Sequence, residues 1–126
     1  MERISQDVLN ELVYNLKRIK YKNIIQDLKL EYCEDKDGDY IYLVLINIKK
    51  SQRRNGYGAA VLSEIIKAAD KYKVRIRLWA TNIYGSDLKR LYGFYRKQGF
   101  VLLDNGVEGH MIYYPCLLYT SDAADE

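Results

Sequence analysis

Three segments of the chain carry apolar residues at helical spacing. The first follows Ser5, a residue type that caps helices, and its stripe is Val8, Leu9, Leu12, Val13, Leu16 and Ile19. The second follows the stretch SQRRNGYG, and its stripe is Val61, Leu62, Ile65, Ile66, Ala69 and Tyr72. The third starts at Ser86 and Asp87, and its stripe is Leu88, Leu91, Tyr92 and Tyr95. Gly99 can end it in a left-handed conformation. The pattern therefore predicts three helices.

Strand patterns fill the space between and after these helices. Residues 27–34 (DLKLEYCE) form the first, and an Asp-Gly pair at positions 37 and 38 predicts a hairpin turn. Residues 40–48 are apolar on both faces except Asn47, which predicts a central strand covered on both sides. Residues 74–80 (VRIRLWA) predict a third strand, and two short strands follow around residues 100–103 and 110–114.

The order of these elements is helix, strand, strand, helix, strand, helix, strand, strand. The link from Ile48 to Val74 is a strand–helix–strand connection, which predicts two parallel strands and a right-handed crossover. The other strands should be antiparallel. We therefore expect an α+β sandwich, with a mixed, mostly antiparallel sheet and helices on both faces, formed by a single domain over residues 1–115.

Composition narrows the class of protein. The chain has 126 residues, of which 48% are hydrophobic, so a disordered or fibrous protein is excluded. No apolar run approaches the ~20 residues of a membrane span. The start, MERISQDVLNEL, is charged and amphipathic and is not a secretory signal, so we expect a cytoplasmic protein. Two cysteines without CxxC spacing and one histidine support neither a metal site nor a disulfide framework.

The last residues, 116–126 (CLLYTSDAADE), match one reading frame of a common transposon-based sequencing adapter. We expect them to be a non-native tail, with a natural polar tail as the alternative, and native residues after Pro115 to be missing. Without the tail the chain has 20 bases and 17 − 3 = 14 acids, a net charge of +6. A basic domain attracts anions, and the sum alone does not choose among nucleic acid, phosphates and an acidic cofactor.

The stretch SQRRNGYGAA, residues 51–60, combines charge with bare backbone at the start of the second helix. A helix N-terminus leaves N–H groups unpaired, and Gly56 and Gly58 remove side chains that would keep a ligand away from them. Arg53 and Arg54 add positive charge, so the stretch predicts a phosphate site. It is not a nucleotide P-loop, and the dinucleotide fingerprint fails at Val61.

The string R-x-x-G-x-G-A over residues 53–59 resembles motif A of the GCN5-related N-acetyltransferases (GNAT), which binds the pyrophosphate of acetyl-coenzyme A (acetyl-CoA). FYRKQGF, residues 94–100, is similar to the Y-x-x-x-G-F segment of that family. The strands VRIRLWA and MIYYP follow in the expected order, so the resemblance covers residues 40–115. Family members usually open with a strand and two helices. Only one helix precedes the hairpin here, which leaves one side of the substrate groove undefined.

The resemblance implies roles for individual residues. The cofactor-binding positions are Ile46, Asn47, Ile48, Arg53, Arg54, Asn55, Gly56, Tyr57, Gly58 and Ala59. Residues 46–48 would pair with the pantetheine arm and offer a backbone N–H to the thioester oxygen. Arg54 stands where many members have glycine. Tyr95 matches the tyrosine that protonates the departing thiolate.

The sequence does not identify the general base that would remove a proton from the amine. Tyr42 occupies the position where histone-type members carry a glutamate. A water relay, Glu31, Glu108 and His110 are the alternatives.

The expected function is thus acetyl transfer from acetyl-CoA to a primary amine by direct attack. The acceptor would be a small molecule, a protein lysine or an N-terminus, with no membrane partner and no metal, in a monomer or homodimer. One alternative is a catalytically inactive GNAT-fold binding or regulatory module, which the missing glutamate favours. A less favoured one is a small basic nucleic-acid-binding domain, motivated by the net charge and by the bases Arg53, Arg54, Arg75, Arg77, Lys89 and Arg90.

Overall fold

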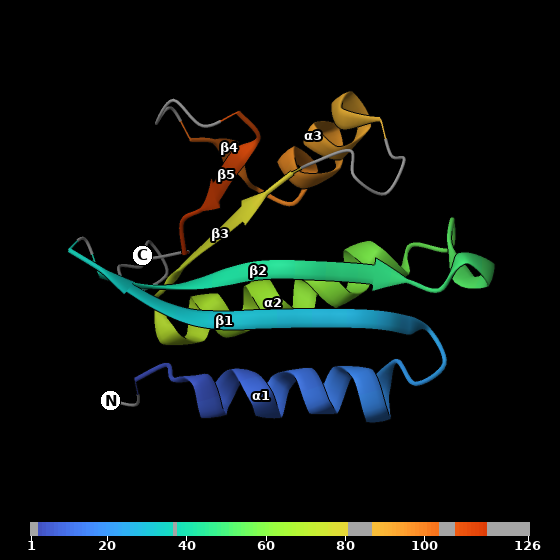
Figure 1. Ribbon diagram of the computed structural model, residues 1–126, viewed down its shortest axis with the longest axis horizontal. Coiled ribbons are helices and arrows are strands. Elements are labelled where there is room, and N and C mark those ends of the chain that lie inside the picture. The colour runs from blue at the N-terminus through green and yellow to red at the C-terminus, as the bar shows by residue number, and fades with distance from the viewer. Residues whose placement is uncertain (1–2, 37, 81–86, 104–107, 116–126) are drawn as a thin grey trace, which may run out of the picture.

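The computed structural model describes residues 3–36, 38–80, 87–103 and 108–115. Helix α1 (Gln6–Tyr14) continues as a π-helical segment, η1 (Asn15–Lys20), and the hairpin β1 (Ile25–Asp35) and β2 (Gly38–Ile48) follows (Figure 1). A 3-10 turn, η2 (Lys50–Gln52), leads to α2 (Tyr57–Tyr72) and β3 (Arg75–Trp79). Helix α3 (Leu88–Lys97) and the strands β4 (Val101–Leu102) and β5 (His110–Tyr113) complete the chain. The predicted order of elements is confirmed.

The five strands form one sheet in the order β1-β2-β3-β5-β4. Strands β2 and β3 are parallel, as the crossover through α2 predicts, and the other neighbours are antiparallel. The α+β class and the mixed, mostly antiparallel sheet are therefore confirmed.

The ends of the helices also follow the sequence. Ser5 caps α1 by accepting a hydrogen bond from the Val8 N–H, and Asp87 caps α3 in the same way through the Lys89 N–H. Gly99 has φ +104° directly after α3, as a left-handed stop requires. Ser86 and the predicted tail at 116–126 lie outside the described residues. No helix in the described part of the chain has the length and apolar content to cross a membrane.

One face of the sheet carries the core. Leu30, Leu43, Leu78 and Met111 are register partners across four strands, so they share a face, and each is at most 4% exposed. All three helices add buried residues to this cluster, among them Leu9 of α1, Leu62 of α2 and Tyr95 of α3. An ion pair between Lys20 and Glu64 ties the end of η1 to α2.

The opposite face differs from the prediction. Figure 1 looks onto this face of β1 and β2, and none of the helices that the structure describes crosses it there. Asp27, Lys29 and Glu31 of β1 lie on it, and Val44 of β2 is 40% exposed. The expectations of helices on both faces and of a doubly covered strand at 40–48 are thus wrong over β1 and β2. The reason is that charged side chains on β1 offer a helix no apolar surface to bury.

Candidate active site

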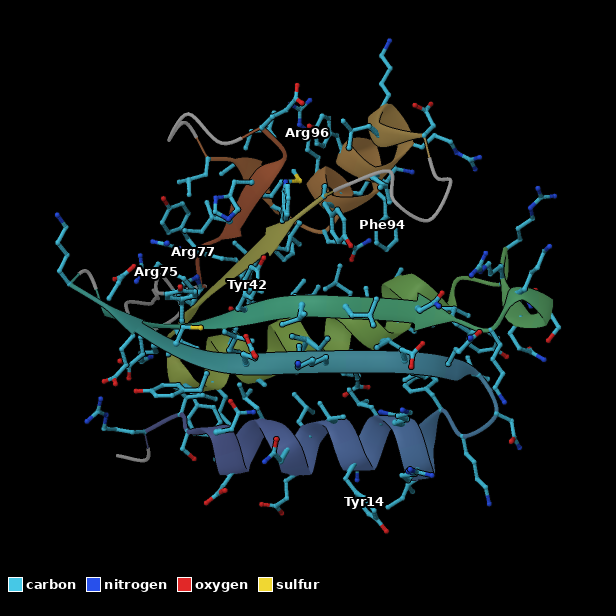
Figure 2. All side chains as sticks on the ribbon, viewed as in Figure 1. Tyr14, Tyr42, Arg75, Arg77, Phe94 and Arg96 are labelled. Carbon is cyan, nitrogen blue, oxygen red and sulfur yellow. The ribbon has the colours of Figure 1, made fainter. Side chains whose placement is uncertain are left out.

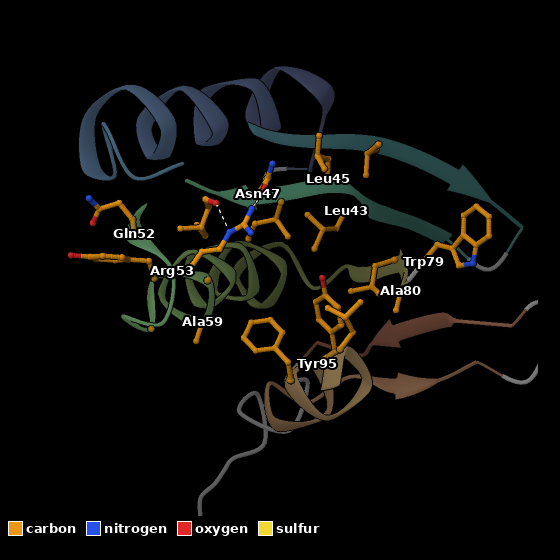
Figure 3. Close-up of a pocket in the computed structure, with 18 of the residues that line it drawn as sticks. Leu43, Leu45, Asn47, Gln52, Arg53, Ala59, Trp79, Ala80 and Tyr95 are labelled. Atoms are coloured by element: carbon orange, nitrogen blue, oxygen red, sulfur yellow. Dashed lines mark hydrogen bonds between the residues drawn. The ribbon is translucent and has the colours of Figure 1, made fainter. Parts of the chain in front are cut away.

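The site begins where β2 and β3 separate. Their pairing runs only from Tyr40–Arg75 to Leu43–Leu78, although β2 continues to Ile48. Beyond Leu43, no strand in the described part of the chain pairs with the edge of β2 that faces β3. A cavity of about 840 Å³ opens there, lined by residues of β2, β3, α2 and α3 (Figure 3). Its volume lies within the usual range for small-molecule sites.

The cavity brings most of the predicted site residues together. The predicted residues in its lining are Ile46, Asn47, Ile48, Arg53, Arg54, Gly56, Tyr57, Gly58, Ala59 and Tyr95. Asn55 is not among them, and its side-chain amide instead donates to the Gln52 carbonyl at 3.3 Å. Sequence reasoning missed the opposite wall, which includes Leu78, Trp79, Ala80, Leu91 and Phe94.

The first residues of α2, Tyr57, Gly58 and Ala59, line this cavity. The Ala60 N–H makes a helical hydrogen bond to the Gly56 carbonyl, and no side chain caps the helix. Helix geometry therefore leaves the N–H groups of Tyr57, Gly58 and Ala59 without an intrahelical acceptor. Gly56 has φ +79° and Arg54 has φ +68°, so Arg54 occupies a backbone conformation that glycine adopts most easily.

Arg53 has a role that the sequence did not predict. Its Nε donates to the Ile48 carbonyl at 3.0 Å and its guanidinium donates to Asn47 Oδ1 at 2.9 Å (Figure 3). The guanidinium therefore braces the loop against the end of β2. The Asn47 side chain is engaged in this brace.

A β-bulge at Val44 bends β2 at the start of the cavity. Lys29 pairs with Leu45 and Leu30 pairs with Leu43, so Val44 is an extra residue on β2. A bulge strengthens local twist and re-aims the side chains that follow it. Here it coincides with the point where β2 leaves β3. Nothing in the apolar run of residues 40–48 marks its position.

Tyr95 reaches the cavity from α3 (Figure 3). The residue is only 9% exposed, and its ring packs edge-on against Phe94 and Phe100, with centroids 5.2 and 5.7 Å away. Burial raises the pKa of the Tyr95 phenol above its ordinary value of 10.0. The phenol therefore keeps its proton at neutral pH, and can donate it.

Trp79 and Ala80 are held by close backbone packing. The Trp79 indole donates to the Glu108 carbonyl at 2.9 Å, and the Ala80 N–H donates to the Gly109 carbonyl at 2.8 Å. Gly109 has φ +87°, and a Cβ there would lie 2.5 Å from the Ala80 carbonyl oxygen. Only glycine fits this contact, which fixes the β3 side of the cavity.

The candidate bases stand at the margin of the site. Tyr42 lines the cavity, Glu31 is its register partner on β1, and His110 pairs with Trp79. None of the described residues that line the cavity is an aspartate, a glutamate or a histidine. Among the described residues no cluster of histidine, cysteine and acidic side chains could hold a metal ion.

The parallel strands β2 and β3 thus splay apart beside the N-terminus of α2, and the buried Tyr95 lines the same cavity. The family model described as the acetyltransferase (GNAT) family matches residues 23–100. The chain belongs to this family, whose members use acetyl-CoA. None of the curated proteins matches the chain.

Solved structures show the same fold at low sequence identity. The anti-CRISPR protein AcrVA5 is 18% identical with a TM-score of 0.54, over 68% of this chain and 88% of that chain. AtaTR bound with AcCoA is 18% identical with a TM-score of 0.53, over 69% of this chain and 55% of that chain. Arabidopsis thaliana Naa50, in complex with the bisubstrate analogue CoA-Ac-MVNAL, is 14% identical with a TM-score of 0.52. The match covers 88% of this chain and 93% of that chain.

Proposed function

We propose that this protein is an N-acetyltransferase that moves the acetyl group of acetyl-CoA directly to a primary amine. The observation that carries the proposal is the cavity between β2 and β3, which joins an uncapped helix N-terminus to a buried tyrosine. Acetyl-CoA would supply the activated acetyl group as a thioester.

The N-terminus of α2 fits the phosphates of that co-substrate. The N–H groups of Tyr57, Gly58 and Ala59 lack intrahelical acceptors, and the helix dipole favours negative charge at this end. The exposed Arg54 adds a full positive charge to the cavity rim. Because the main contacts would be to backbone, Arg54 and Asn55 are acceptable where related sequences carry other residues.

The free edge of β2 fits the pantetheine arm. Residues 46–48 extend past the last pair with β3, so backbone groups on that side, apart from the Ile48 carbonyl that accepts from Arg53, are available to an extended, amide-bearing ligand, as in strand addition. One N–H of this edge would donate to the thioester oxygen and stabilise the charge that develops there during attack.

Tyr95 would then act as the general acid. Its hydroxyl is protonated at neutral pH because the ordinary pKa of a phenol is 10.0, and burial raises the pKa of Tyr95 further. Phe94 and Phe100 fix the ring. A positioned donor of this kind returns a proton to the leaving sulfur.

A second candidate is a GNAT-fold module that binds the co-substrate without turnover. It is favoured by the absence of a carboxylate or imidazole from the described cavity lining. In the enzyme, proton removal from the amine would pass through water or through Glu31, which lies beside Tyr42. The two candidates differ in turnover but not in binding.

Calorimetric titration with acetyl-CoA tests the shared step. Ala59→Glu places a carboxylate in the cavity wall at the third helical position, where glutamate suits the helix dipole and should not unfold the domain. Ala60→Glu is the matched control, because Ala60 has the same intermediate burial but does not line the cavity. We expect binding by the wild type and Ala60→Glu, and at least a ~30-fold loss in Ala59→Glu, since phosphates and carboxylate repel each other in a site of low dielectric.

A folded wild-type protein that binds no acetyl-CoA would refute both candidates. If binding is present, an amine panel followed by free-thiol detection separates them. Release of free thiol that depends on an amine supports the enzyme, and binding without release across the panel supports the module.

A further inference from the structure

The positive charge of the chain is concentrated at one end of the molecule. Residues 15–27 and 47–64 form this basic end. Their charged residues are the bases Lys17, Arg18, Lys20, Lys22, Lys49, Lys50, Arg53 and Arg54 and the acids Asp27 and Glu64. Their net charge is 8 − 2 = +6, whereas the rest of the chain has 20 − 8 = 12 bases and 17 − 2 = 15 acids, a net −3.

The two segments meet in space. The Lys49 N–H donates to the Ile24 carbonyl at 2.8 Å, and the rings of Tyr21 and Tyr57 contact each other edge-on with centroids 6.4 Å apart. In Figure 1 the end of α1, the start of β1, the end of β2 and the start of α2 all lie at the right-hand side. The two segments that carry the bases therefore lie together at one end of the molecule.

Acetyl-CoA accounts for only part of this surface. The cavity lies on the β3 side of β2, and of the eight bases only Arg53 and Arg54 line it. Lys17, Arg18 and Lys22 belong to η1 and the turn after it, on the side of β2 that carries β1 and α1. Arg18 and Lys22 are exposed. The acetyl-CoA cavity therefore leaves 8 − 2 = 6 of these bases outside its lining.

Exposed apolar groups lie among these bases. Tyr14 and Ile19 are each 61% exposed, and Figure 2 shows Tyr14 projecting from α1 into solvent (Figure 2). Tyr14 and Arg18 are four residues apart, the spacing at which side chains on one helix face are neighbours. Proteins that bind single-stranded nucleic acid combine these groups, because bases stack on rings while cations follow the backbone.

We propose that η1, the turn after it and Lys49 and Lys50 form a docking surface for single-stranded RNA. An anionic membrane fits less well, because the apolar face of α1, including Leu9 and Leu16, is buried in the core. Duplex DNA fits less well, because the remainder of the exposed side of α1 carries Asp7 and Glu11, which would repel a second phosphate strand. The RNA surface goes beyond the proposed acetyl transfer and does not depend on it.

Fluorescence anisotropy of the full chain with a labelled single-stranded RNA of about 16 nucleotides tests the surface. The test pair is Lys17→Glu with Arg18→Glu. The control pair is Arg96→Glu with Lys97→Glu, which are also adjacent bases in the last turn of a helix but lie on α3. Tyr14→Ala probes stacking. Thermal unfolding and acetyl-CoA titration of each variant report folding and the cofactor site separately.

We expect RNA affinity to fall with salt at a log–log slope of about −3 or steeper, since each neutralised phosphate contributes about −0.7. The test pair should bind at least about 10-fold more weakly, Tyr14→Ala about 5-fold more weakly, and the control pair within about 2-fold of wild type. Equal losses in the two pairs, absent binding at low salt, or equal or tighter binding of duplex DNA or of vesicles with anionic headgroups would overturn the proposal. Loss of acetyl-CoA binding alone would count against the proposed function and not against this surface.

Discussion

The two ends of β2 are built for different purposes. At the end that begins with the hairpin, β2 pairs with β1 on one side and with β3 on the other. Asp35 there bonds to both Arg75 and Arg77, at 3.2 and 2.9 Å, and the Arg77 guanidinium lies 4.5 Å from the Tyr40 ring. At the other end β2 loses β3 and faces a cavity.

The two ends differ in whether their polar groups are paired within the protein or remain available to a ligand. At the paired end, side-chain charges are matched internally. At the splayed end, β2 beyond Leu43 pairs with no β3 residue in the described part of the chain, and the first N–H groups of α2 have no intrahelical acceptor. Arg53 holds the loop there by bonds to Ile48 and Asn47. Substitutions at the paired end should therefore change stability, and those at the splayed end should change ligand binding or turnover.

The largest expected effect is on turnover at the splayed end. Tyr95→Phe removes one hydroxyl from a buried ring and keeps its packing against Phe94 and Phe100. We expect turnover with a reactive amine to fall by about 10²–10⁴-fold, because the leaving sulfur loses its proton donor. The affinity for acetyl-CoA should change by less than about 3-fold. Steady-state kinetics and calorimetry on the same preparations measure both.

The pH dependence gives a second check on Tyr95. Its folded pKa is raised, so its contribution to stability is complete below the unfolded value of 10.0 and is lost as the pH rises through the folded value. Wild type should therefore lose more stability than Tyr95→Phe between neutral and strongly alkaline pH. Parallel alkaline losses in denaturant titrations would show that the phenol is not shielded as the structure indicates.

The paired end should respond in the opposite way. Asp35→Ala leaves two guanidiniums, 15% and 21% exposed, without their shared carboxylate. We expect a loss of about 2–4 kcal/mol in the free energy of unfolding, because removing one partner of a mostly buried ion pair strands the other charges. Glu34→Ala is the control, because its carboxylate is 66% exposed and lies 3.9 Å from Arg3, and it should cost less than about 0.5 kcal/mol. Denaturant unfolding measures both, and a drop in acetyl-CoA affinity of the folded Asp35 variant would break the separation between the two ends.

Much of this separation could be predicted from the sequence. Apolar periodicity located the helices and strands, and the Ile48-to-Val74 crossover predicted the parallel pair. The glycines and arginines of residues 53–59 identified the loop that now lines the cavity. These features are local, so the spacing of a few residues determines them.

The features that escaped prediction depend on contacts between distant segments. The bulge at Val44 is defined only by the register with β1, and Gly109 is required only because the Ala80 carbonyl lies against it. The sequence does contain a signal for the solvent-exposed face of β1, since the charged residues Asp27, Lys29 and Glu31 alternate with apolar residues along the strand. The apolar run of β2 outweighed that signal, which led to the wrong expectation of helices on both faces.

The smallest expected effect concerns the brace between Arg53 and the end of β2. Arg53→Ala should weaken acetyl-CoA binding about 10-fold, or ~1.4 kcal/mol, with little change in stability, because the side chain is exposed and its bonds order only the loop. Asn47→Ala removes one bond of the brace and keeps the cation.

The two variants distinguish a brace from a direct phosphate ligand. If Arg53 acts by bracing, Asn47→Ala should reproduce part of the loss, about 3-fold, and the double variant should be no weaker than Arg53→Ala alone, because both changes disrupt one unit. If the guanidinium leaves Asn47 and contacts phosphate, Asn47→Ala should be neutral or tighter, and the loss in Arg53→Ala should shrink with added salt. The second pattern would mean that the Arg53 side chain, like the backbone at the splayed end, binds the ligand. Side chains as well as backbone groups would then be paired within the protein at one end of β2 and bind a ligand at the other.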